Sequence, residues 1–68
     1  MNIEANIKQY LEDHGIVQSY LSRKAGVPLV KLNLSLNGKR KMTLPEYRSV
    51  CKALGVPADT FLEPHPPA

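Results

Sequence analysis

The chain has 68 residues, a net charge of +3, a single cysteine and no tryptophan. This length allows one small domain, with too little room for both a core and a deep substrate pocket, so we expect no enzymatic activity, no cofactor and no small-molecule substrate. The lone Cys51 excludes an intramolecular disulfide, and no apolar stretch reaches the roughly 20 residues that cross a bilayer. Because the start also carries no signal pattern, we expect a cytoplasmic protein.

Acidic and basic residues are segregated along the chain. The segment from His14 to Pro45 contains no acidic residue, and all six acids lie outside it. Such segregation predicts a polyanionic partner, either nucleic acid or an anionic membrane, whereas a solvated lysine-rich face is the alternative. The basic residues of this segment are Arg23, Lys24, Lys31, Lys39, Arg40 and Lys41.

Two helices are predicted in the first part of the chain. Residues 3–13 place apolar side chains on one stripe of an amphipathic helix, which Gly15 ends as a left-handed cap. A shorter helix follows over residues 18–25, with Leu21 turned inward, and Gly26 breaks it. The stripe of the first helix consists of Ile3, Ile7, Tyr10 and Leu11.

A third helix is predicted over residues 28–36, because Pro28 suits the first turn of a helix and Asn37-Gly38 is a strong stop signal. The spacing of its leucines predicts one inward stripe. Residues 32–36 also alternate as a strand would, but an isolated strand would leave its backbone groups unpaired, so we prefer the helix. The inward leucines are Leu29, Leu32 and Leu36.

A fourth helix begins at Thr43, which is spaced to form a capping box with Glu46. Pro45 lies in its first turn and Gly55 ends it. Its inward stripe consists of Leu44, Tyr47, Val50, Cys51 and Leu54.

A short fifth helix is predicted over residues 57–62, where Phe61 and Leu62 pack on the core. Residues 63–68 are half proline and form an irregular tail. The sequence therefore predicts an all-α fold, a compact bundle of five short helices in one domain of residues 1–62.

The second and third helices form a pair that carries a functional signal. Two short helices joined by a glycine-containing turn are typical of the helix-turn-helix. In that motif the first helix crosses the DNA backbone and the second lies in the major groove. Here the second member is the helix of residues 28–36, and basic residues flank it on both sides.

Three segments resemble a known family in register. The stretch from Gln18 to Val27, the turn Asn37-Gly38-Lys39-Arg40 and the close Ala53-Leu54-Gly55-Val56 are similar to the phage Cro/repressor (XRE-like) helix-turn-helix family. The likeness extends from Ile3 to Leu62. It implies a lambda-repressor-like domain of five helices that binds double-stranded operator DNA as a homodimer and regulates transcription.

Candidate DNA contacts follow from this resemblance and from charge. Gln18 matches the glutamine that opens the first helix of the motif and contacts the phosphate backbone. The positions that match the groove-facing side of the second helix are Leu29, Val30, Lys31, Asn33 and Leu34. The candidates outside that helix, in its flanking turns and in the first helix of the motif, are Gln18, Ser19, Arg23, Asn37, Lys39, Arg40 and Lys41.

The groove-facing positions depart from the family pattern. Family members usually place glutamine, serine, threonine or arginine there, whereas this chain has Leu29, Val30 and Leu34. The helical stripe also turns Val30 and Leu34 outward. They either contact the methyl groups of thymine, or belong to a protein contact, or have no role.

Two rival functions keep the same fold. One is a protein-interaction module that has lost base reading, and the other is an antitoxin that binds both DNA and a partner toxin. No catalytic residue and no metal site is predicted, because His14, His65 and Cys51 match no zinc spacing. Candidate dimer contacts are Phe61, the tail and the outer side of the fourth helix.

Overall fold

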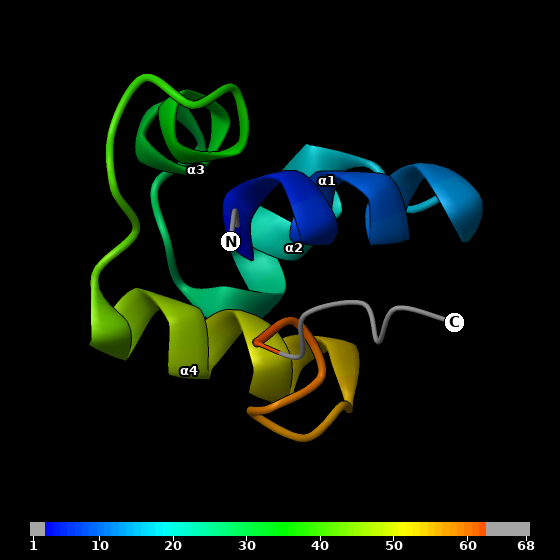
Figure 1. Ribbon diagram of the computed structural model, residues 1–68. Coiled ribbons are helices and arrows are strands. Elements are labelled where there is room, and N and C mark those ends of the chain that lie inside the picture. Colours follow the sequence, from blue (N-terminus) through cyan, green and yellow to red (C-terminus); the bar gives the residue numbers. More distant parts are fainter. Residues whose placement is uncertain (1–2, 63–68) are drawn as a thin grey trace.

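The computed structural model describes residues 3–62, and that part of the chain consists of helices and connecting turns without a strand. The all-helical expectation is therefore confirmed for these residues (Figure 1). None of the described helices is long and apolar enough to span a membrane. The helices are α1 (Ile3–Asp13), α2 (Gln18–Ala25), α3 (Leu29–Leu36) and α4 (Leu44–Leu54).

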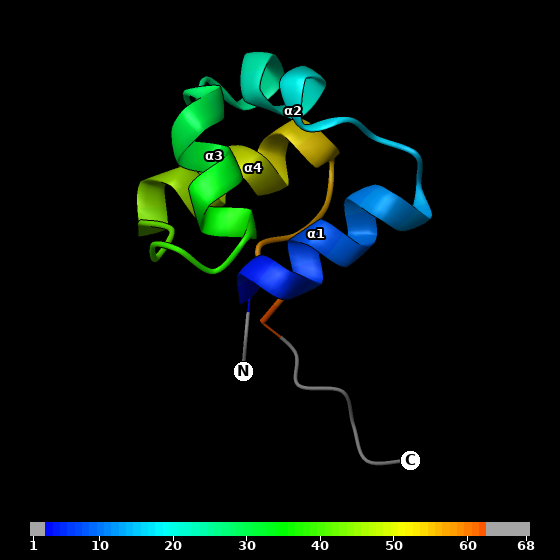
Figure 2. The same ribbon diagram turned by 90° about the horizontal axis from the view of Figure 1, so that it is seen from above.

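The second helix lies at the centre of the packing. α2 packs against both α3 and α4, and α1 packs against α3. Figure 1 views α3 nearly end-on, while α1 and α4 run across the picture, so α3 crosses both at a steep angle. Seen from above, α2 lies next to α3, with which it is in contact (Figure 2).

A short turn fixes the angle between α2 and α3. Gly26 has a φ of 71°, a left-handed conformation that glycine adopts without strain, and its N–H donates to the carbonyl of Ser22. The Ser22 hydroxyl donates to the carbonyl of Val27 over 2.6 Å, and the Val27 side chain is buried. The turn is therefore locked from both sides and sets the direction in which α3 leaves.

The core combines one apolar stripe from each helix with residues from two turns. The predicted burial of Leu21, Leu32, Val50 and Cys51 is confirmed, whereas Leu54 is only half-buried. The buried apolar residues are Ile7, Leu11, Leu21, Val27, Leu32, Leu36, Tyr47, Val50, Cys51 and Phe61.

Two predicted core leucines lie outside. Leu29 is 45% exposed and Leu44 is 68% exposed. Each is the first residue of its helix, and the helix packs on its neighbours only from the following turn onward. The inward prediction is therefore wrong for both leucines, because apolar spacing does not show where along a helix the contact with other elements begins.

One buried residue of α3 is polar. The Ser35 side chain is completely buried, and its hydroxyl accepts a hydrogen bond of 2.9 Å from Nη1 of Arg40. Because a buried hydroxyl is costly only when it lacks a partner, this bond makes the position tolerable. The stripe analysis had assigned the inward side of α3 to leucines alone.

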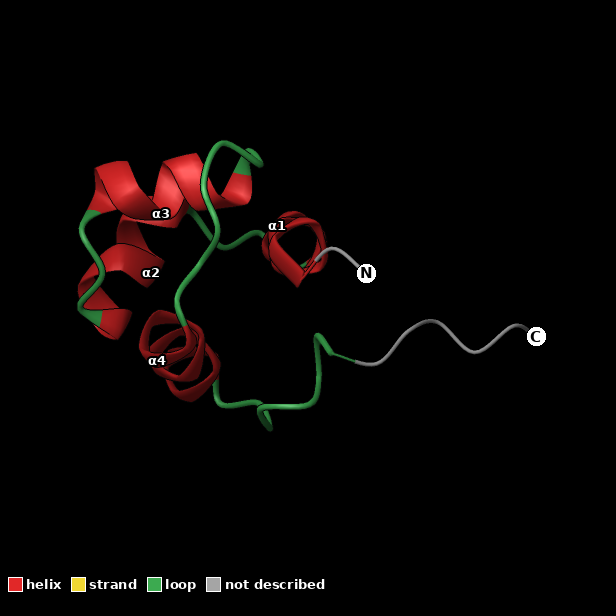
Figure 3. Cartoon of the chain, turned by 60° about the vertical axis from the view of Figure 1, so that its left-hand side comes forward, coloured by secondary structure: helices red, strands yellow, loops and turns green. Residues whose placement is uncertain are grey.

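The predicted fifth helix is wrong. Residues 58–62 form consecutive turns, in which Thr60 and Leu62 donate to carbonyls three residues back. A segment of six residues is too short to form a stable helix by its own hydrogen bonds, because helix nucleation is costly, so its conformation depends on tertiary contacts. Figure 3 displays this segment as a loop that passes below α4 and rises toward α1.

Contacts with distant parts of the chain stabilise this C-terminal segment, which lacks the hydrogen bonds of a helix. The Tyr47 hydroxyl donates to the carbonyl of Ala58, and the Asn6 amide donates to the carbonyl of Phe61 over 3.2 Å. The Phe61 ring is buried against Tyr10 at a centroid distance of 5.5 Å, as its predicted core role requires. Leu62, predicted to pack inward, is exposed. The predicted tail of residues 63–68 lies outside the described residues.

Candidate nucleic-acid interface

The start of α2 and the outer side of α3 form a shallow groove on the surface. It brings together six of the sequence-predicted candidates and adds Val17, which the sequence analysis missed. Val17 immediately precedes α2, and its position in a loop gave no periodic signal. We call this surface the α2–α3 groove. It is lined by Val17, Gln18, Ser19, Leu29, Val30, Asn33 and Leu34.

The α2–α3 groove is largely apolar. Val30 is 72% exposed, and Val17, Leu29 and Leu34 also expose much of their side chains. The outward direction predicted for Val30 and Leu34 is confirmed. Apolar side chains exposed together on one face point to a binding function more strongly than single ones do.

A chain of side-chain hydrogen bonds runs beside the apolar residues. The Lys8 ammonium donates to Oδ1 of Asn37 over 3.1 Å, and Nδ2 of Asn37 donates to Oδ1 of Asn33 over 3.2 Å. Nδ2 of Asn33 then donates to Oε1 of Gln18 over 3.1 Å. The bonds join α1, α3 and α2. Three of these residues were predicted candidates, whereas Lys8 was missed because it belongs to a helix outside the motif.

Exposed cationic side chains lie on the two helices of this face and in the loop that follows α3. Arg23 lies in the last turn of α2, Lys31 lies on α3, and Lys39 and Lys41 lie in the loop between α3 and α4. All four are exposed, and none makes a side-chain hydrogen bond or ion pair with another described residue. Their charges are thus free to attract an anionic partner.

Arg40 differs from its basic neighbours because its guanidinium is engaged within the domain. Nη1 lies 3.0 Å from Oε1 of Glu46, and Nη2 donates to Oε2 over 3.4 Å, so the pair is bidentate. The same Nη1 reaches the buried hydroxyl of Ser35. These bonds give Arg40 a structural role, and its phosphate contact stays a prediction.

Glu46 connects this pair to the start of α4. Its carboxylate accepts the N–H of Thr43 over 3.0 Å, and the Thr43 hydroxyl accepts the N–H of Glu46 over 3.3 Å, which confirms the capping box. The Thr43 N–H and, next, the Arg40 guanidinium hold the pKa of Glu46 below its ordinary value of 4.5.

The lowered pKa of Glu46 makes stability depend on pH. Its extra stabilisation is fully present above pH 4.5 and is lost as the pH falls through the lower folded-state pKa. We expect Glu46→Gln, which can still cap α4, to lower the free energy of unfolding by about 1 kcal/mol at pH 7. At acid pH, urea denaturation should give the two proteins equal stability. Glu12→Gln, at an exposed carboxylate of α1, is the control, and an equal loss there would refute a specific role.

A family model describes this arrangement. The model of the Cro/C1-type HTH DNA-binding domain matches residues 6–67. The chain belongs to this family. Neither the comparison with curated proteins nor that with solved structures found a match. The predicted resemblance to the Cro/repressor helix-turn-helix is thereby confirmed.

In this Cro/C1-type domain, α2 and α3 are the two helices of the motif, and the Gly26 turn joins them. The domain is a DNA-binding domain by its family. The α2–α3 groove lies over the outer side of the second helix of the motif.

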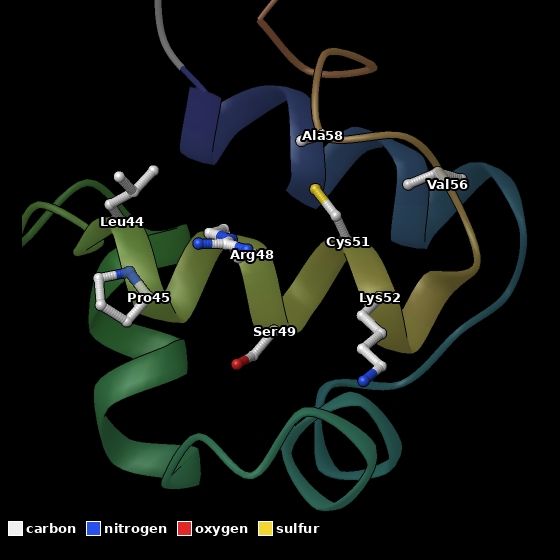
Figure 4. Close-up of a pocket in the computed structure, with 8 residues that line it drawn as sticks. All are labelled: Leu44, Pro45, Arg48, Ser49, Cys51, Lys52, Val56 and Ala58. Carbon is white, nitrogen blue, oxygen red and sulfur yellow. The ribbon is translucent and has the colours of Figure 1, made fainter.

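A second hollow of the Cro/C1-type domain lies over α4 (Figure 4). Leu44 and Val56 project over opposite ends of it, and the sulfur of Cys51 lies between them. Of the predicted dimer contacts, Phe61 is wrong because its ring is buried, so the outer side of α4 is the described candidate that stays exposed. The described residues contain no group of three side chains that could hold a metal ion.

Proposed function

We propose that this Cro/C1-type domain binds double-stranded DNA sequence-specifically and regulates transcription in the cytoplasm, with α3 in the major groove. The observation that carries the proposal is the α2–α3 groove, in which two amide side chains and four exposed apolar side chains share one face. A helix fits the major groove, where base pairs offer donors, acceptors and thymine methyl groups.

The exposed cations on α2, on α3 and in the following loop bind phosphates of the DNA backbone. Arg23, Lys31, Lys39 and Lys41 contact the backbone on either side of α3, and Ser19 and Gln18 contact it at the start of α2. Backbone contacts of this kind supply affinity and fix the orientation of the protein, without reading sequence.

The apolar residues of α3 read thymine. Val30 and Leu34 project from the same side of α3, one turn apart, and both are exposed. Contact with a thymine methyl group is an established way for an apolar side chain to read a base. One such contact gives little discrimination, so we propose that two copies bind an operator as a homodimer, with half-sites about one helical turn apart.

The test is to select a preferred duplex from a random pool and replace its thymines by deoxyuridine, which removes only the methyl groups. For wild type, each contacted methyl is expected to contribute about 0.8 kcal/mol, or roughly a fourfold loss of affinity. Leu34→Ala should be less sensitive to the replacement. Leu44→Ala, at an exposed leucine of α4, is the matched control and should respond as wild type does. Equal responses of all three proteins would refute methyl reading by Leu34.

One observation favours a second candidate. Val17, Leu29, Val30 and Leu34 together expose an apolar surface that a protein partner could cover. In that case the domain would be a protein-interaction module with a helix-turn-helix fold. The selection distinguishes the two functions, because an interaction module would enrich no duplex, whereas a DNA reader would enrich one with two half-sites.

A further inference from the structure

The hydrogen-bond chain that begins at Lys8 has a direction. Three of its members are amides, each of which has an oxygen that accepts and a nitrogen that donates, so an isolated amide can point either way. The fourth member is an ammonium, which donates and cannot accept. A chain with an ammonium at one end is therefore consistent with only one arrangement of all the amides.

The observed contacts follow that arrangement. Because Lys8 can only donate, the atom of Asn37 that faces it is the oxygen, at 3.1 Å. The nitrogen of Asn37 then faces the oxygen of Asn33, and the nitrogen of Asn33 faces the oxygen of Gln18. The amide nitrogen of Gln18 is left at the end of the chain, with its N–H groups available to an acceptor outside the domain.

The direction of the chain matters where α3 would meet base edges. Asparagine reads adenine by accepting from N6 and donating to N7 at the same time. An amide held in one orientation fits adenine in one placement, whereas thymine offers only an acceptor and a methyl group there. A fixed Asn33 therefore distinguishes an A·T pair from a T·A pair, and a freely turning Asn33 does so less well.

We propose that Lys8, on α1 and outside the helix-turn-helix, is a positioning residue that fixes the amide orientation of Asn33 for base reading and, through Asn33, that of Gln18 for its phosphate contact. The inference rests on the proposed major-groove function of α3. The bonds of the free protein are exposed, and a bound duplex would cover them. Hydrogen bonds strengthen in such a drier environment, so the orientation is best defined when DNA is bound.

The test uses the duplex that wild type selects from a random pool. Each A·T pair of this duplex is inverted in turn, and the affinity of each inverted duplex is measured for wild type and for Asn33→Ala. The pair that Asn33 reads is the one whose inversion lowers the affinity of wild type but not that of Asn33→Ala. For wild type, inverting that pair is expected to lower the affinity roughly 5- to 150-fold. In Lys8→Met this penalty should shrink at that pair and stay unchanged at the others.

Two further variants separate orientation from other effects. Lys8→Gln keeps a donor next to Asn37 but can also accept, so it should lose discrimination as Lys8→Met does. Lys8→Arg can only donate and should retain the wild-type penalty. Lys24→Met removes one exposed charge elsewhere on α2 and should lower the affinity for all duplexes by one factor. Circular dichroism melting checks that every variant is folded.

The outcomes are distinct. If wild type enriches no duplex, the proposed function fails, and the role of Lys8 fails with it. If wild type enriches a duplex but Lys8→Met and Lys8→Gln keep the full inversion penalty, the proposed function stands and the positioning role is overturned. A uniform loss for Lys8→Met, equal to that of Lys24→Met, would make Lys8 a phosphate contact only.

Discussion

Replacing Lys39 and Lys41 together by alanine is expected to lower the affinity for duplex DNA roughly 60-fold for each bound copy of the domain at about 0.1 M salt, by the same factor for every sequence. Both side chains are exposed and free of partners among the described residues. Each phosphate contact that is lost removes about 0.9 from the slope of log affinity against log salt, so the slope should fall by roughly 1.8 for each bound copy. Fluorescence anisotropy titrations at several salt concentrations measure both quantities.

Arg40 is left out of this variant for a structural reason. Its removal would leave Glu46 without its ion pair and the buried hydroxyl of Ser35 without a hydrogen-bond partner. A loss of binding could then not be distinguished from a loss of stability. The control removes Arg48 and Lys52, two exposed cations of α4. If the control, still dimeric by analytical ultracentrifugation, loses as much affinity as the loop variant, the loop does not face the DNA.

Leu32→Ala is expected to lower the free energy of unfolding by about 2–5 kcal/mol. The Leu32 side chain is completely buried in the core, so the substitution leaves a cavity that the surrounding helices fill only in part. A domain of this size has a thin margin of stability, and the loss is a large share of it. Urea denaturation followed by circular dichroism measures the change.

Leu34→Ala is the matched control for this loss. It truncates a leucine of the same helix, but on the exposed side, so we expect a change within about 0.5 kcal/mol. We expect Leu32→Ala to lose stability and keep its DNA binding, and Leu34→Ala to lose DNA binding and keep its stability. This result would separate the core face of α3 from the face that contacts DNA. Equal destabilisation by the two substitutions would contradict this division.

Local signals in the sequence determined the four helices. Thr43 and Glu46 form the capping box that their spacing predicts, and Gly15 and Gly26 adopt the left-handed conformation that ends a helix. These features act over three or four residues, so the neighbouring sequence contains their cause. The family resemblance could be recognised for the same reason, since its segments are local and in register.

The candidate interface was predicted in part. Gln18, Asn33 and Leu34 were recognised as candidates, and the structure brings them to one groove. Leu29 was predicted both to lie on the inward stripe and to face the groove. Because its side chain is exposed, the inward prediction is wrong. Val17 was missed because a loop residue has no periodic pattern.

Only the tertiary structure decided the remaining features. Residues 58–62 form turns, and long-range contacts from Tyr47 and Asn6 supplement the hydrogen bonds within them. Lys8 reaches Asn37 across 29 positions of the sequence. Helix periodicity fixes which side chains share a face, but the packing of α1 on α3 decides which faces meet. The residue that orients the amides could therefore not be read from the motif that contains them.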